Sequence, residues 1–137
     1  MLDITPWAGL FLVGLLWGGT NPFIKRGSTG VKKIKASNII VQLLLELKYL
    51  FTEWRYVLPF ALNQLGSVVF FLTLQKTDLS LAVPIANAST FLFTALVGQF
   101  LGEDKITKET LIGILLVLSG IMLCVYDKSE LTGIDHE

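Results

Sequence analysis

The chain has 137 residues, of which 53% are hydrophobic and only 16% are charged, against about 25% charged residues in a typical soluble domain. Eleven basic and eleven acidic residues leave no formal net charge, and no nucleic-acid partner is expected. Together with a mean hydropathy of +0.65, this composition excludes the water-soluble classes and indicates a protein that lies in the lipid bilayer.

Four segments carry no charged side chain and are apolar and long enough to cross a bilayer. A hydrocarbon core of about 30 Å requires about 20 helical residues. Backbone groups in hydrocarbon must bond internally, and continuous apolar runs without alternation favour helices over barrel strands. The sequence therefore predicts an all-α, multi-pass bundle that forms one membrane domain over residues 1–137. Its four spans are residues 4–24, 57–75, 79–101 and 110–126.

The first span ends in the sequence Trp17-Gly18-Gly19-Thr20-Asn21-Pro22. Two glycines and a proline near the membrane boundary permit a kink or the close approach of another helix. Thr20 and Asn21 would place polar groups at the edge of the bundle. The simpler interpretation is a tryptophan of the aromatic belt followed by the end of the helix.

The long loop after the first span, residues 25–56, contains a further helical pattern at about residues 38–51. As a fifth span it would bury Glu46 and Lys48, at a cost of about 2.5–3.5 kcal/mol each near the bilayer centre. We therefore expect an amphipathic helix in the membrane interface. Three lysines within residues 32–35 precede it and suit anionic headgroups. The alternative is a helix that only packs on the bundle.

The second and third spans carry polar residues that predict a substrate-binding cleft. Asn63 and Ser67 are four residues apart and share one helical face, while Asn87, Thr90 and Thr94 form a stripe along the third span. An unpaired polar group in hydrocarbon costs several kcal/mol, so these side chains should face other helices. If the stripe on the third span lies opposite Asn63 and Ser67, the five residues could line a polar cleft. Interhelical hydrogen bonding alone is the competing interpretation.

The fourth span contains two glycines, Gly113 and Gly120, that are seven residues apart and therefore share a helical face. Small residues in such positions permit close helix packing, either within the chain or against a second copy. Because four short helices enclose little volume, we expect a homodimer. We expect Cys124, in the same span, to be a small buried hydrophobic residue.

No Asp, Glu, Lys, Arg or His falls within any of the four spans, although proton- and ion-coupled transporters normally keep such a group in the membrane. The sequence also lacks a nucleophile–base pair and a phosphate-binding glycine loop. A single cysteine and a single histidine exclude an intrachain disulfide and a His/Cys metal cluster built by one chain. We expect no enzymatic activity, no cofactor and no metal site.

Basic residues are distributed unevenly about the four spans. Nine of the eleven lie in the loop after the first span or in the connection between the third and fourth spans. Only Lys76 and Lys128 lie on the side that holds the termini. The positive-inside rule therefore predicts that the long loop is cytoplasmic and that both termini are non-cytoplasmic.

Several segments resemble known membrane families. Residues 17–22 are similar to the tryptophan–glycine signature of the drug/metabolite transporter superfamily. Residues 77–85 resemble the segment of that superfamily in which a threonine and small residues lead to a proline at the start of a helix. Residues 102–104 resemble its glycine–glutamate connection. From Leu15 to Tyr126 the chain resembles the transmembrane protein 234 family more closely. This resemblance includes the sequence Leu62-Asn63-Gln64-Leu65-Gly66-Ser67.

The resemblance implies a four-helix membrane protein related to the small multidrug resistance exporters and to half of a larger carrier. Those exporters keep a glutamate in the middle of their first helix, whereas residues 11–17 here are Phe-Leu-Val-Gly-Leu-Leu-Trp. Proton-coupled drug export is therefore not expected. Because the larger carriers have twice as many helices, transport by this chain would require a dimer.

Two functions are compatible with these observations. The first is a transporter-like protein that handles a small polar or lipid-linked solute along the predicted cleft. The second is a non-transporting membrane scaffold or accessory subunit that binds a partner through the fourth span or the loop helix. The first predicts a small-molecule or lipid ligand, and the second predicts a protein partner.

Overall fold

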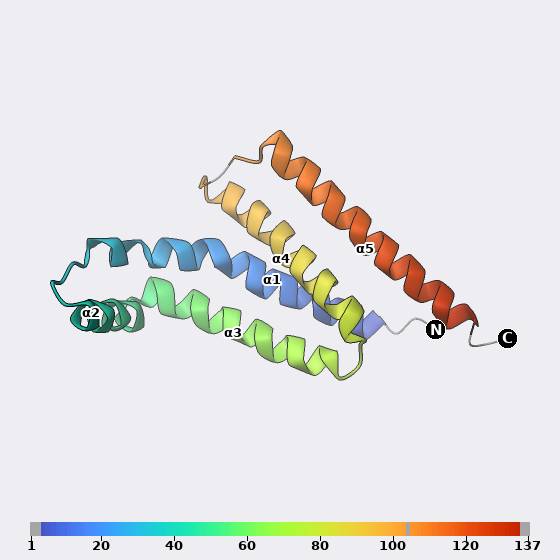
Figure 1. Cartoon of the computed structure of the whole chain (residues 1–137), viewed down its shortest axis with the longest axis horizontal. Coiled ribbons are helices and arrows are strands. Elements are labelled where there is room, and N and C mark those ends of the chain that lie inside the picture. Colours follow the sequence, from blue (N-terminus) through green and yellow to red (C-terminus); the bar gives the residue numbers. More distant parts are fainter. Residues whose placement is uncertain (1–3, 104, 135–137) are drawn as a thin grey trace.

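A computed structural model gives the fold and describes residues 4–103 and 105–134 (Figure 1). Four helices are long and apolar enough to cross a membrane, and within the described ranges no strand is found. The predicted all-α, four-span architecture is therefore confirmed. The elements in chain order are α1 (Ile4–Gly27), the 3-10 helix η1 (Thr29–Lys33), α2 (Ile39–Thr52), α3 (Trp54–Leu74), α4 (Leu79–Phe100) and α5 (Lys108–Ile134).

Helix α1 lies between α3 and α4 and makes most of the interhelical packing in the bundle (Figure 1). Leu10 and Val13 of α1 are completely buried. They form the core with four residues of the first turns of α4, namely Leu81, Ala82, Ile85 and Ala86. Because α1 separates α3 from α4, the second and third spans do not face each other directly.

Glycines allow the backbone of α1 to approach both neighbours closely. A Cβ atom added at Gly14 would collide with Ser89 of α4. At Gly66 of α3, an added Cβ would lie 2.6 Å from Trp17 Cδ1. Small residues at helix contacts are the common means of close packing in a membrane, where dispersion forces replace the hydrophobic effect.

Helix α5 stands apart from this tightly packed unit and contacts α4 only sparsely (Figure 1). Among the described side chains of α5, the hydrophobic residues that pack against the core cluster are Ile121 and Val125. Cys124 is exposed, so the expectation that it is buried is wrong. The reason is that α5 covers the bundle along one narrow strip, and Cys124 lies outside that strip.

The ends of the helices are arranged in two groups. The described chain begins and ends on the same side of the bundle, where the turn between α3 and α4 also lies (Figure 1). The segments that connect α1 to α3 and α4 to α5 lie on the opposite side (Figure 1). We call the first group the terminal end and the second the loop end. Helix α2 is present where the sequence predicts one, at the loop end.

Candidate functional site

Asn63 joins α3 to α1 by hydrogen bonds. Its Nδ2 atom donates to Thr20 Oγ1 at 2.9 Å and to the Trp17 carbonyl oxygen at 3.4 Å. The Thr20 hydroxyl itself donates to the Leu16 carbonyl oxygen at 2.6 Å, and this threonine is only 8% exposed. The amide of Asn63 is therefore engaged at the interface between α1 and α3.

Thr94 joins α4 to α1 in the same manner. Its hydroxyl donates to the Gly18 carbonyl oxygen at 3.2 Å and accepts from Asn21 Nδ2 at 3.2 Å. Thr90, one turn earlier, donates to the Ala86 carbonyl oxygen of its own helix at 2.7 Å. Two members of the predicted α4 stripe thus lie beside α1.

The structure does not bring the five predicted cleft residues to one surface. Asn63 and the half-buried Ser67 lie on α3, whereas Thr90 and Thr94 lie on the other side of α1. Asn87 is exposed on α4. These positions favour the hydrogen-bonding interpretation for Asn63 and Thr94. A role of these residues in substrate binding stays a prediction.

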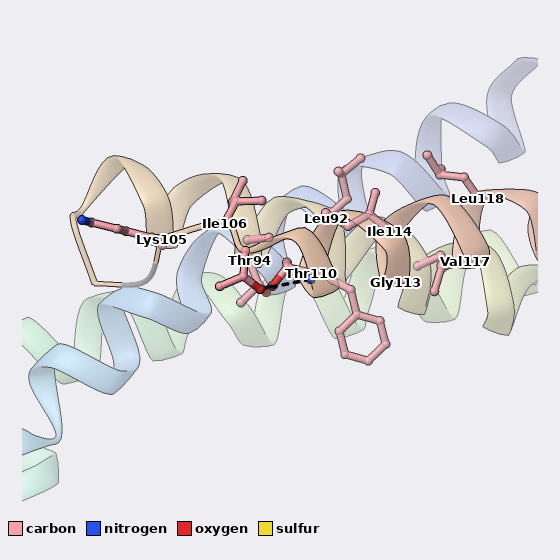
Figure 2. Close-up of a pocket in the computed structure, with 14 residues that line it drawn as sticks. Leu92, Thr94, Lys105, Ile106, Thr110, Gly113, Ile114, Val117 and Leu118 are labelled. Carbon is pink, nitrogen blue, oxygen red and sulfur yellow. Dashed lines mark hydrogen bonds between the residues drawn. The ribbon is translucent and has the colours of Figure 1, made fainter.

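A groove of about 560 Å³ lies between α4 and α5, and we call it the α4–α5 groove (Figure 2). Thr94 and Thr110 lie near its loop end, and Val117 and Leu118 lie farther along α5 (Figure 2). Lys105 lies at the loop end, with its amine directed away from the groove (Figure 2). The lining residues are Ala88, Phe91, Leu92, Thr94, Ala95, Gly98, Lys105, Ile106, Thr107, Thr110, Gly113, Ile114, Val117 and Leu118.

Small residues on both helices keep this groove open. A Cβ atom added at Gly98 of α4 or at Gly113 of α5 would meet no other atom within 4 Å. The same is true of Gly120, which does not line the groove. The two glycines that were predicted to pack helices or form a dimer therefore stand in open space within this chain.

An ion-pair cluster holds the loop end of the groove. Arg26 Nε lies 2.7 Å from Glu103 Oε1, and the guanidinium also donates to the Leu101 carbonyl oxygen. Lys25 Nζ lies 3.6 Å from Glu103 Oε2. The turn before it closes through Gly102, whose φ of +69° suits glycine. This cluster ties the connection between α4 and α5 to the end of α1.

The terminal end of α5 is held by a second ion pair. Lys128 Nζ lies 2.5 Å from Asp78 Oδ2, at the start of α4. The sequence places Asp78 and Glu103 at the ends of spans, but their cationic partners are 50 and 77 residues away. Asp104, which the sequence places beside them, lies outside the described residues. Only the packing of the helices reveals these pairs.

Sequence reasoning also missed the α4–α5 groove. The signal for it in the sequence is a set of small residues near one face of α4, namely Ala88, Ala95 and Gly98. A further hollow of about 380 Å³ lies between the first turns of α1 and the last turns of α3. Among the described residues, no group of three His, Cys, Asp or Glu side chains could hold a metal ion.

Comparison with known proteins assigns the chain to a family. Residues 10–125 match the family model described as "Putative transmembrane family 234". A "Transmembrane protein 234 homolog" of Dictyostelium discoideum is 51% identical over 119 residues, which cover 87% of this chain and 93% of that relative. A relative of the same name from Anopheles gambiae is 48% identical over 127 residues, which cover 93% of this chain and 91% of that relative. No solved structure matches the chain. The chain therefore belongs to the transmembrane protein 234 family.

Proposed function

We propose that this protein is a carrier-like membrane protein, without catalytic activity, that takes an amphipathic, lipid-like solute into the α4–α5 groove. One observation carries the proposal: two candidate spans enclose a groove of about 560 Å³ within a bundle whose other helix contacts are close. This volume is within the range of about 300–1,000 Å³ that is typical of ligand sites. The resemblance of residues 17–22 to the drug/metabolite transporter signature supports the carrier class.

The lining of the groove suits a molecule with an apolar chain and a polar head. Most of the wall is aliphatic or aromatic, while the hydroxyl-bearing residues Thr107 and Thr110 lie toward the loop end of the groove. Lys105 lies at the same end, although its amine is directed away from the groove (Figure 2). The α4 wall extends from Ala88 to Gly98, which corresponds to about 15 Å of helix. This length is half of a hydrocarbon core of about 30 Å. The groove therefore matches the depth of one leaflet.

The loop end is the cytoplasmic end in this proposal, because the positive-inside rule favours that side for the lysine- and arginine-rich loop. The solute would then enter from the cytoplasmic leaflet. A second copy of the chain on α5 would cover the open side of the groove, which supports a carrier that acts as a dimer. Coupling to protons is not part of the proposal, since the four predicted spans contain no Asp, Glu, Lys, Arg or His.

The test uses two glycine variants that leave the fold intact. A leucine side chain at Gly98 would fill the groove, whereas Gly120 lies farther along α5 and is not among the lining residues. Neither new Cβ meets an atom within 4 Å, and leucine favours a helix interior over glycine by about 1 kcal/mol. Both variants should therefore fold, and Gly120→Leu is the matched control.

The measurement is mass spectrometry of lipids that co-purify with the protein in mild detergent. We expect Gly98→Leu to lose the bound lipid and Gly120→Leu to retain it at the level of the unaltered protein. Equal lipid retention in both variants would show that the groove is not the binding site and would remove the support for a carrier.

A scaffold that binds a partner helix through α5 is the second candidate function. The observation that favours it is the exposure of α5: between Lys108 and Glu130, the part of the helix with described side chains, no residue is buried. The same two variants separate the candidates. A scaffold predicts that Gly120→Leu loses a co-purifying protein while Gly98→Leu keeps it.

A further inference from the structure

Helix α2 lies across the axes of the spans. It is seen end-on in the view in which α1 and α3 run across the picture (Figure 1). A single residue, Glu53, joins α2 to α3. Its N–H donates to the Tyr49 carbonyl oxygen at 2.9 Å and caps the C-terminus of α2. Its Oε1 accepts from the Arg55 N–H at 3.3 Å and caps the N-terminus of α3. The two caps build a defined corner between the helices.

The polar side of α2 is directed toward the rest of the chain. Gln42 Nε2 donates to Glu46 Oε1 at 2.9 Å, and both side chains are half-buried. The Tyr49 hydroxyl donates to the Gly27 carbonyl oxygen at 3.5 Å, and its ring lies against Gly30. The contacts of Tyr49 with Gly27 and Gly30 fix the rotation of α2 about its own axis.

Eight apolar residues of α2 are exposed, and six of them form an apolar arc that this rotation leaves without cover. The other two, Val41 and Leu45, lie on the far side of Lys48. At about 100° per residue, the six occupy about 140° of the helix circumference. Their exposed fractions range from 42% to 84%. The apolar arc consists of Ile39, Ile40, Leu43, Leu44, Leu47 and Phe51.

Basic residues lie beside the apolar arc. Lys32 and Lys33 end η1, Lys35 follows in the connection to α2, and all three are exposed. Lys48 is exposed at the edge of the arc. An apolar face with lysines at its border is the composition of helices that lie in the headgroup region, with the apolar face sunk about 5–10 Å into the boundary with the acyl chains.

We propose that α2 and the lysines before it form an interfacial anchor that binds anionic phospholipids of the leaflet at the loop end. The cap-built corner sets α2 in the plane of the membrane when α1 and α3 cross it. The apolar arc then meets acyl chains, and the lysines meet anionic headgroups, which attract each nearby lysine or arginine. This anchor is separate from the α4–α5 groove and does not depend on the proposed carrier function.

The first test measures the position of α2 with spin labels in lipid nanodiscs. In a Cys124→Ser background, Leu44→Cys places a label on the apolar arc, and Ser37→Cys places one at an exposed residue just before α2. We expect the label at position 44 to collide more with oxygen, which dissolves in the bilayer, and the label at position 37 more with a water-soluble nickel complex. A label at position 44 that prefers nickel, or that neither reagent reaches because a protein covers it, overturns the proposal.

The second test measures lipid selectivity. Spin-labelled phosphatidylserine should associate with the full chain in preference to spin-labelled phosphatidylcholine. We expect the combined change Lys32→Gln, Lys33→Gln and Lys35→Gln to lower this preference about threefold or more, and high salt to have a similar effect because it screens the charges. The three side chains are exposed, so the variant should fold. A preference that survives the triple change overturns the role of the lysines as an anionic-lipid site.

Discussion

Polar side chains within this bundle mainly join helices, as Asn63 and Thr94 show. Each makes a hydrogen bond from its own helix to α1, with donor–acceptor distances of 2.9 and 3.2 Å. Measured hydrogen bonds between membrane helices contribute about 0.6 kcal/mol on average and about 1.7 kcal/mol at most. These residues therefore add modestly to stability and strongly constrain which helix faces meet.

Replacing Asn63 by leucine should destabilise the bundle. The change removes the bonds to Thr20 Oγ1 and to the Trp17 carbonyl oxygen, and we expect the free energy of unfolding to fall by about 1 kcal/mol. Denaturant unfolding in mixed micelles, followed by circular dichroism, measures this change. Asn87→Leu is the control, because Asn87 is exposed and its loss should change stability little. If Asn87→Leu keeps the fold and abolishes ligand binding, the result would favour ligand binding in the predicted polar cleft over binding in the α4–α5 groove.

Replacing Gly14 by alanine should be more damaging, although alanine favours helices. The new Cβ would collide with Ser89 on α4, and such overpacking costs about 1–3 kcal/mol. The unfolding free energy should fall accordingly. Gly120→Ala, whose Cβ meets no atom within 4 Å, should leave stability unchanged or slightly raise it. Equal stabilities of the two variants would contradict the close contact between α1 and α4.

At the scale of elements, the connection between α4 and α5 is held by charges from α1. Glu103 is only 16% exposed and is paired with Arg26 and Lys25. The Asp78–Lys128 pair at the other end of α5 is more open, with side chains that are 61% and 41% exposed. Exposed ion pairs are screened by water and contribute little. The loop end should therefore be the firmer attachment of α5.

The change Arg26→Gln should loosen the loop end. It leaves the Leu101 carbonyl oxygen and Glu103 without their guanidinium partner. A charged hydrogen bond contributes about 1.5–3 kcal/mol, and the loss here should be smaller because the Arg26 side chain is 47% exposed. We expect faster amide hydrogen exchange at residues 98–103, measured by mass spectrometry. Asp78→Asn at the terminal end should leave this segment unchanged. Slow exchange in Arg26→Gln would mean that the cluster does not hold the connection.

At the scale of the whole molecule, the grouping of helix ends allows the orientation to be tested. Ser37 is exposed at the loop end, and Ser80 is exposed at the terminal end. In a Cys124→Ser background and in sealed vesicles with the cytosolic face outward, an impermeant thiol reagent should label Ser37→Cys directly. It should label Ser80→Cys only after detergent opens the vesicles. The reverse pattern would invert the proposed orientation.

Several elements could be predicted from the sequence because they depend on local composition. The four spans, the helix α2 and the family follow from uncharged apolar runs, helical spacing and motifs such as residues 17–22. The helices extend beyond the predicted spans: α3 begins at Trp54 and α5 covers Lys108–Ile134, whereas the predicted spans are residues 57–75 and 110–126. Helical hydrogen bonding continues past the point where charged residues begin, so hydropathy underestimates helix length.

The candidate site could be predicted only in part. The sequence identifies Asn63 and Thr94 as groups that need a partner in the membrane, because an unpaired polar group in hydrocarbon is costly. It does not show that α1 supplies the partner for both. The α4–α5 groove escaped prediction because it depends on the distance between two helices, and Gly98 alone does not reveal whether that space is filled.

The sequence by itself determined the membrane environment, the number of spans and the presence of α2, because these properties sum over neighbouring residues along the chain. Tertiary structure alone decided that α1 is central, that α5 stands apart and that a groove opens between α4 and α5. These features depend on contacts between residues far apart in sequence, such as Gly14 with Ser89 and Arg26 with Glu103. In a bilayer every span is apolar, so hydrophobicity does not distinguish the neighbours, and the fit of small side chains and paired polar groups selects them.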